Sequence, residues 1–62
     1  MIEFVIKTTK ENRATIKEQI NDFGEVSEYW SDGSFNFQCH RDSSIDPMVH
    51  LLEELHVEFE LI

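Results

Sequence analysis

The chain has 62 residues, which predicts a single domain near the lower size limit for independent folding. Its hydrophobic fraction of 40% is sufficient for one core, and its net charge of −8 disfavours contact with phosphate backbones and membrane surfaces. We therefore expect no direct nucleic-acid binding and no membrane binding, and we expect a protein partner with a basic surface.

The charges are unevenly distributed along the chain. Four of the five basic residues lie within residues 1–17, whereas all but two of the thirteen acidic residues come after them. Cys39 is the only cysteine, which excludes an internal disulfide and is typical of a reducing compartment. The opening MIEFVIKTTK lacks the features of a signal peptide, and no apolar run approaches the roughly 20 residues that cross a bilayer. These features predict a soluble, cytoplasmic protein.

The first two elements follow from periodicity. Ile2, Phe4 and Ile6 alternate with polar or solvent-facing positions, which predicts a strand with one buried face. Thr8 and Glu11 then have the spacing of a capping box, and apolar residues recur at helical intervals as far as Phe23. We expect a helix over about residues 10–22, ended by Gly24 in a left-handed conformation.

A hairpin is predicted next, because EVSEYW and SFNFQC flank Ser31-Asp32-Gly33. After the loop RDSSIDP, Asp46 is the expected N-cap and Pro47 the first residue of a second helix. The apolar stripe of that helix is expected to face the core and comprises Met48, Leu51, Leu52 and Leu55. The alternation in VEFELI predicts a closing strand.

The predicted order is β-α-β-β-α-β, with no linker or repeat. Right-handed crossovers place both helices on the same side of one antiparallel sheet. The expected fold class is therefore α+β, a ferredoxin-like domain over residues 1–62 in which two helices pack on one face of a four-stranded sheet of order 4-1-3-2.

The register of the hairpin decides which side chains face solvent. A two-residue loop would place the carboxylate of Glu28 beside Phe37 in the core, at a cost of several kcal/mol. A three-residue loop with Gly33 left-handed instead places Tyr29 and Ser27 on the core side. We favour the second register, which turns Val26, Glu28 and Trp30 outward.

The uncovered sheet face is the candidate interaction surface. Strand parity and the 4-1-3-2 order place Trp30 toward one edge and an acidic cluster of Glu3, Glu58 and Glu60 near the other. Exposed aromatic residues with a polar rim are typical of protein interfaces, although Trp30 folding over the end of the hairpin is an equal alternative. The predicted partner-binding residues are Trp30, Glu28, Val26, Glu3, Glu58 and Glu60.

The sequence offers little for catalysis. The soft metal ligands are Cys39, His40, His50 and His56. They lack CxxC and zinc-type histidine spacing, and neighbours on a strand such as Cys39 and His40 point to opposite faces. Gly24 and Gly33 are isolated, so there is no phosphate-binding loop. We expect no metal site, no cofactor and no catalytic residue.

Residues 28–61 contain in order EYW, FNFQC, a helix led by Pro47 and VEFEL. With these features the segment resembles the ferredoxin-like domain of Api92-like proteins of phages and plasmids. The family's second tryptophan and its aromatic-proline step before the helix are absent. The resemblance implies the same fold and a mobile-element origin, and it implies no enzymatic activity. The signature residues of heavy-metal-binding domains, RNA-recognition domains and acylphosphatases are missing.

The function expected from the sequence is that of a small acidic non-enzymatic binding module. It would act as a phage- or plasmid-encoded inhibitor or regulator of a basic, nucleic-acid-handling host protein. The alternative is a self-associating structural or ligand-sensing domain, a homodimer that pairs through the free sheet faces.

Overall fold

The computed structural model of the protein describes residues 2–62. It contains two α-helices and four strands in the predicted order. The elements are β1 (Ile2–Lys7), α1 (Lys10–Ile20), β2 (Gly24–Tyr29), β3 (Phe35–Cys39), α2 (Ile45–Glu54) and β4 (Glu58–Leu61). Short 3₁₀ turns at Asn21–Phe23 and Asp42–Ser44 adjoin the helices.

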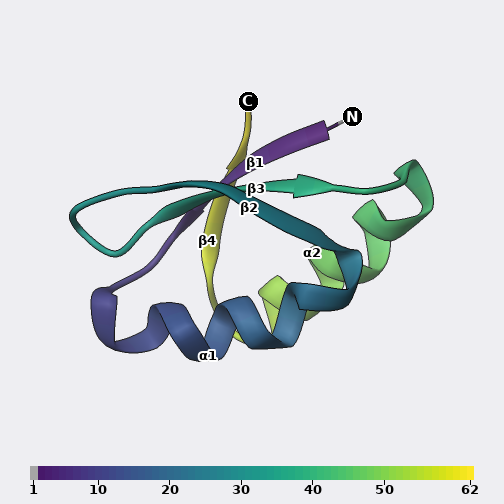
Figure 1. Cartoon of the computed structure of the whole chain (residues 1–62). Helices are drawn as coiled ribbons and strands as arrows, with labels where there is room; N and C mark the ends of the chain where they lie inside the picture. Colours follow the sequence, from purple (N-terminus) through teal and green to yellow (C-terminus); the bar gives the residue numbers. More distant parts are fainter. Residues whose placement is uncertain (1) are drawn as a thin grey trace.

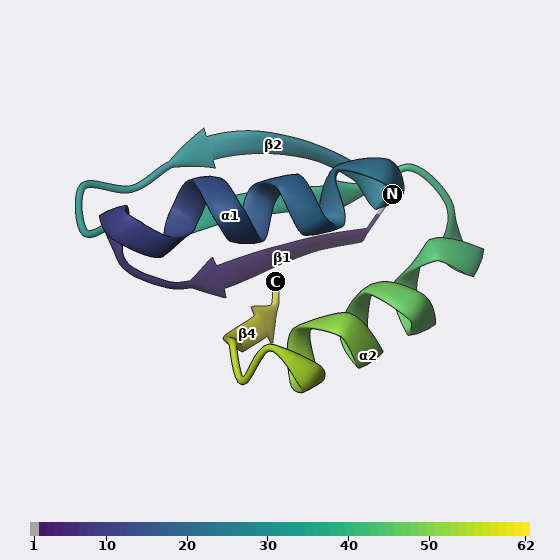
Figure 2. The same ribbon diagram turned by 90° about the horizontal axis from the view of Figure 1, so that it is seen from below.

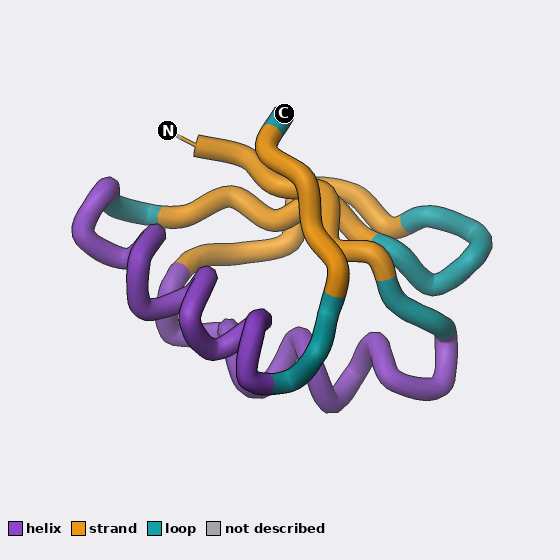
Figure 3. Tube along the Cα trace, turned by 180° about the vertical axis from the view of Figure 1, so that it is seen from behind, coloured by secondary structure: helices purple, strands orange, loops and turns teal. Residues whose placement is uncertain are grey.

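The strands form one antiparallel sheet in the order β2-β3-β1-β4. Read from the β4 edge, the same sheet has the order 4-1-3-2. Both helices lie on the same side of the sheet and leave its other face uncovered (Figures 1 and 3). Viewed from the helix side, α1 lies in front of β3, with β1 and β2 on either side of it (Figure 2). This α+β arrangement is compatible with a ferredoxin-like fold.

The core lies between the sheet and the two helices. Phe35 and Phe37 of β3 are its largest buried side chains, which accords with the position of β3 inside the sheet. The other buried apolar residues are Phe4 and Ile6 of β1, Ile16 and Ile20 of α1, Cys39 of β3, and Met48 and Leu52 of α2. Leu51 packs partly buried against them, whereas Leu55 is 40% exposed, so the stripe predicted for α2 covers the core over fewer residues than expected.

The start of α1 differs by one residue from the capping-box prediction. The N-cap is Thr9, whose side-chain oxygen accepts a hydrogen bond of 3.3 Å from the backbone N–H of Asn12. Thr8 precedes the cap, and its N–H donates to the side chain of Ser34 at 3.4 Å. Thr8 therefore ties the start of α1 to the hairpin.

The prediction that Gly24 ends α1 in a left-handed conformation is wrong. The helix ends at Ile20 and continues as a 3₁₀ turn, and Gly24 has an extended φ of 173° as the first residue of β2. A side chain at Gly24 would overlap the backbone carbonyl of Gln38 on β3. Glycine is required there because two backbones approach closely, and not because of its φ angle.

The second helix begins earlier than predicted. Ser44 is the N-cap and makes no side-chain capping hydrogen bond, so the prediction of Asp46 as the N-cap is wrong. Asp46 and Pro47 lie in the first turn of α2. The negative charge of Asp46 is favourable there, and the missing N–H of Pro47 costs nothing because N–H groups of the first turn have no partner within the helix. The preceding 3₁₀ turn at Asp42–Ser44 leads the chain into the helix without a side-chain cap.

The end of α2 is a Schellman motif with histidine in the position usually held by glycine. The N–H of Val57 donates to the carbonyl of Leu52 at 3.0 Å, and the N–H of His56 donates to that of Glu53 at 3.1 Å. His56 has a φ of 57°, in the left-handed region that disfavours residues with a Cβ.

We predict that His56→Gly stabilises the fold by about 1 kcal/mol, because glycine adopts this φ without the steric penalty. Urea denaturation followed by far-UV circular dichroism measures the change. His56→Ala is the matched control, since it removes the imidazole and keeps the Cβ, and it should gain much less. Equal stabilisation by both variants would contradict the backbone explanation.

The hairpin has the predicted three-residue loop. Tyr29 pairs with Phe35, the N–H of Trp30 donates to the carbonyl of Ser34 at 2.8 Å, and Gly33 has a φ of 106°. The carboxylate of Asp32 accepts a hydrogen bond of 2.9 Å from the N–H of Ser34 and closes the turn. The hydrogen bond holds the pKa of Asp32 below its ordinary value.

The predicted register is correct from Glu28 to the turn and is shifted by one residue in the part of β2 before Glu28. Val26 pairs with Phe37 and Glu28 with Asn36, so Ser27 is an extra residue in a β-bulge. Val26 therefore packs partly buried against the core, and its prediction as an outward-facing binding residue is corrected. The bulge turns Ser27 and Glu25 to the uncovered face, where sequence parity alone places Val26.

Candidate functional site

The candidate site is the sheet face opposite the helices, called here the free face. The strand pairing assigns to it Glu3, Val5 and Lys7 of β1, Glu25, Ser27, Glu28 and Trp30 of β2 and its extension, Asn36 and Gln38 of β3, and Glu58 and Glu60 of β4. Five of these side chains are carboxylates and one is a lysine. The free face is therefore strongly acidic.

Glu3 is the centre of a hydrogen-bond network on this face. Its Oε1 accepts from the amide of Gln38 at 3.0 Å, and its Oε2 accepts from the amide of Asn36 at 2.8 Å and from the hydroxyl of Ser27 at 3.3 Å. The donors come from β3 and β2, so the carboxylate of β1 joins three strands. Ser27 takes part only because of the bulge.

The network lowers the pKa of Glu3. The hydrogen bond from Gln38 is the largest cause and that from Asn36 the next, and both favour the ionised carboxylate. Because the folded-state pKa is depressed, Glu3 stabilises the fold above its unfolded pKa of about 4.3. That contribution is lost as the pH falls through the lower folded-state pKa.

We predict that Glu3→Gln lowers stability at neutral pH and that its difference from the wild-type protein shrinks in acid. Urea denaturation between about pH 6 and pH 2 measures this difference. Asp32 also has a depressed pKa but is common to both proteins, so its effect cancels. A titration of the Glu3 carboxyl carbon by NMR with a midpoint at or above about 4.3 would contradict the prediction.

Trp30 extends this network toward the hairpin end. Its indole N–H donates to the side-chain oxygen of Asn36 at 2.7 Å, while the amide nitrogen of Asn36 donates to Glu3. Trp30 is 48% exposed, whereas Asn36 is only 9% exposed. The indole is thus anchored to the free face by its edge and remains half accessible to a partner, as the preferred register predicts.

Tyr29, the neighbour of Trp30, belongs to the opposite side of the sheet. Its ring lies 6.5 Å from that of Phe35, and the charged groups of Arg13 and Lys17 on α1 lie 5.0 and 5.4 Å from its centre. Tyr29 is 51% exposed at the sheet edge. Two adjacent aromatic residues of similar exposure therefore have very different surroundings.

The three carboxylates of the predicted acidic cluster, Glu3, Glu58 and Glu60, do not converge on a common site. Glu3 bonds across to β3, whereas Glu60 makes an ion pair with Lys7 at 3.3 Å and Glu58 lies opposite Lys7 in the strand pairing. Within residues 2–62 no group of three or more His, Cys, Asp or Glu side chains is placed to hold a metal ion. Glu28 is exposed on β2, as predicted. The acids are spread over the face and create a broad negative field.

Neither edge of the sheet is well suited to pairing with an added strand. β2 carries the bulge at Ser27 and the exposed acids Glu25 and Glu28. β4 has only four residues, and Glu58 and Glu60 are exposed on it. Bulges, charges and short length are the features that block edge-to-edge association.

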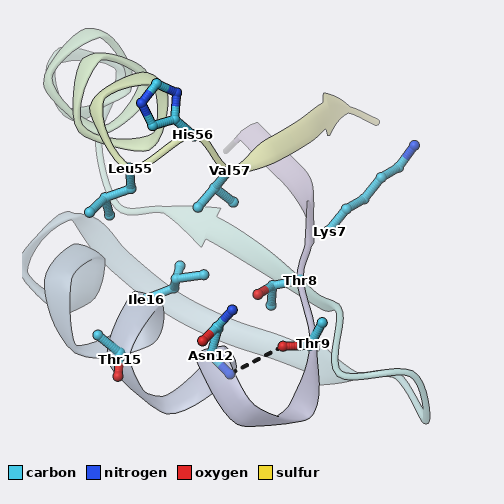
Figure 4. A pocket seen from close by; sticks show the side chains of 9 residues that line it. All are labelled: Lys7, Thr8, Thr9, Asn12, Thr15, Ile16, Leu55, His56 and Val57. Carbon is cyan, nitrogen blue, oxygen red and sulfur yellow. Dashed lines mark hydrogen bonds between the residues drawn. The ribbon is translucent and has the colours of Figure 1, made fainter.

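A second surface feature is a shallow cleft of about 440 Å³ between the start of α1 and the turn into β4. The side chains of Ile16, Leu55 and Val57 point into it, whereas Lys7 and His56 point away (Figure 4). Thr8 and Asn12 form part of its polar wall. The cleft has an apolar floor and lacks converging charged groups among the residues that line it.

Cys39 is a core residue. It is 1% exposed, and its thiol lies 3.6 Å from the sulfur of Met48. Burial raises the pKa of the thiol, which keeps it protonated and unreactive. His40 is exposed beyond the end of β3, so these two neighbours do not form a nucleophile and base.

The role of Asn36 and Gln38 as hydrogen-bond donors to Glu3 was missed from the sequence. The alternation in FNFQC predicts that both amide side chains point away from the core. Two amides close to a carboxylate on the neighbouring strand are the signal from which these hydrogen bonds could have been predicted. Ser27 and Glu25 were missed because nothing in EVSEYW marks the bulge.

Among residues 2–62, no helix has the length and apolar character required to cross a membrane. No family model, curated protein or solved structure matches the chain.

Proposed function

We propose that the protein is a non-enzymatic binding module whose free face docks on a basic surface of a protein partner. The observation that carries the proposal is an uncovered sheet face on which Trp30 is half exposed among acidic side chains. A fixed aromatic residue supplies contact area at low entropic cost, and surrounding carboxylates favour encounter with a positively charged partner.

The organisation of the free face supports this reading. Glu3, Asn36 and Trp30 are joined by hydrogen bonds before any partner arrives, so the surface loses little conformational freedom on binding. The sheet edges carry features that oppose strand addition. A ferredoxin-like assignment and the resemblance to Api92-like domains, which implies a mobile-element origin and no enzymatic activity, fit an inhibitor or regulator of a basic nucleic-acid-handling host protein.

Self-association through the free faces is the weaker alternative. Two copies meeting face to face would bring Glu25, Glu28 and Glu58 of one against the same acidic surface of the other. Like charges in juxtaposition across an interface are strongly unfavourable. A basic partner does not meet this repulsion, so we favour a heterologous complex.

Affinity capture from host lysate at about 50 mM and about 500 mM salt tests the proposal, with retained proteins identified by mass spectrometry. The wild-type chain should retain a basic protein at low salt only. The double variant Glu28→Lys/Glu58→Lys should lose at least about tenfold of the captured amount, because two repulsive charges enter the interface.

The matched control is Glu11→Lys/Glu18→Lys on the exposed side of α1. It changes the net charge by the same amount but leaves the free face intact, so capture should persist. Equal loss in both double variants would show that net charge alone governs retention, and absence of any retained protein at both salt concentrations would remove the proposal.

A further inference from the structure

The edge of the Trp30 indole is already occupied within the protein. Its only hydrogen-bond donor, the ring N–H, is used at 2.7 Å by the side-chain oxygen of Asn36. Asn36 is held in turn by Glu3, so the ring is fixed along the free face. What Trp30 can still offer a partner is its exposed aromatic surface.

The hydrogen bonds also increase the electron density of that surface. The charge of Glu3 polarises the amide of Asn36 through the 2.8 Å hydrogen bond, which makes the oxygen of Asn36 a stronger acceptor for the indole N–H. Electron density withdrawn from the N–H bond toward the ring favours interaction with a cation over its face. Tryptophan is already the best of the aromatic residues for this interaction.

The protein's own cations contact Tyr29, the aromatic neighbour of Trp30. Within residues 2–62 both cation–π contacts, from Arg13 and Lys17, are made to Tyr29 on the helix side. On the free face the single basic residue is Lys7, which pairs with Glu60 at the β4 edge, the edge opposite to Trp30. Trp30 therefore has an electron-rich, half-exposed ring in an acidic setting. Arg13 contacts Trp30 only through a hydrogen bond of 3.5 Å to its backbone carbonyl, and within residues 2–62 neither cation–π contact is made to the indole.

We infer that the partner places an arginine side chain on the exposed face of Trp30, with Glu28 as the acceptor for its guanidinium N–H groups. Glu28 lies two residues before Trp30 on the same side of the chain, opposite Asn36. A planar guanidinium can stack on the indole and donate two parallel hydrogen bonds to a carboxylate, which an ammonium group cannot do. The inference rests on the proposed function and names the group that this surface recognises.

Binding of short peptides tests the inference without knowledge of the partner. The probes are acetylated, amidated hexa-arginine and hexa-lysine with a fluorescent label, and hexa-glutamate as a negative control. Fluorescence anisotropy at low salt measures affinity for every variant, and the emission of Trp30, the single tryptophan, reports contact in the wild-type protein. We expect the wild-type protein to bind hexa-arginine at least about threefold more tightly than hexa-lysine, with a change in Trp30 emission.

Trp30→Leu should weaken hexa-arginine binding about two- to fivefold and abolish the preference over hexa-lysine. Tyr29→Leu is the matched control, because Tyr29 is equally exposed and its ring already faces Arg13 and Lys17; its effect should be less than about twofold. Trp30→Phe keeps a weaker aromatic face and should give an intermediate affinity. Thermal unfolding of each variant establishes that it is folded before binding is measured.

Equal affinities for the two basic peptides, or unchanged arginine binding in Trp30→Leu, would overturn the inference. If a captured basic protein still depended on the free-face carboxylates, the proposed function would stand and only the arginine contact would fail. If the peptides and the captured protein both bound independently of the free face, both proposals would fail.

Discussion

Replacing Gly24 with alanine is expected to lower the free energy of unfolding by about 3 kcal/mol, the upper part of the range for overpacked sites. The added Cβ would overlap the carbonyl oxygen of Gln38 and lie 2.9 Å from the Cα of Cys39. These are backbone atoms inside the sheet, so β2 can accept the methyl group only by moving away from β3. For a chain of 62 residues, whose total stability is roughly 3 to 9 kcal/mol, this loss removes much of the folded population.

Two further variants separate close approach from backbone conformation. Gly24→Asn would be tolerated if the position were left-handed, but the extended φ of 173° predicts that it is at least as damaging as alanine. Ser27→Ala in the same strand should cost less than about 0.5 kcal/mol, because its hydrogen bonds of 3.3 and 3.5 Å are long and the side chain is exposed. Urea denaturation by far-UV circular dichroism compares all three. Wild-type stability in Gly24→Asn would contradict the close-approach explanation.

The fold could be predicted because its main signals are local and agree with one another. Alternation of Ile2, Phe4 and Ile6 gave the buried face of β1, and the Ser31-Asp32-Gly33 segment gave the position of the hairpin turn. Helix ends were less accurate, because Thr8 and Thr9 have the same capping chemistry and only the tertiary contact of Thr8 with Ser34 decides between them. The role of Gly24 could not be read from the sequence, since it depends on the distance between two backbones.

The candidate site was predictable as far as strand parity holds. The cost of burying Glu28 gave the correct register next to the turn, and this placed Trp30 outward. The same alternation failed for the residues before Glu28, because the bulge at Ser27 adds one residue to β2. Val26 therefore faces the core, and its neighbours Glu25 and Ser27 face the free side. A bulge changes pairing by local backbone geometry and leaves no clear composition signal, so the Ser27 contact with Glu3 required coordinates.

Replacing Phe37 with alanine is expected to cost about 3 to 5 kcal/mol, comparable with the whole stability of the chain. Phe37 is 1% exposed and lies in the strand pairing between Phe4 of β1 and Val26 of β2. Its removal leaves a cavity beneath the centre of the sheet, and the surrounding strands cannot close it without losing their hydrogen bonds. Far-UV circular dichroism at increasing urea concentration should show little or no folded baseline.

Phe37→Leu is the first control and should cost about 1 kcal/mol, since most of the buried volume remains. Tyr29→Ala is the second control, because Tyr29 pairs with Phe35 on β3, the strand that carries Phe37, but is half exposed. This variant should lose about 1 kcal/mol of stability, from reduced burial and from the loss of two cation–π contacts. A larger loss at Tyr29 than at Phe37 would contradict the observed register.

Because Asn36 lies between Phe35 and Phe37 and points to the other side, the buried aromatics of β3 also fix the direction of the amide that orients Trp30. The core and the candidate docking surface are thus two faces of the same strand, and disruption of one is expected to disorder the other.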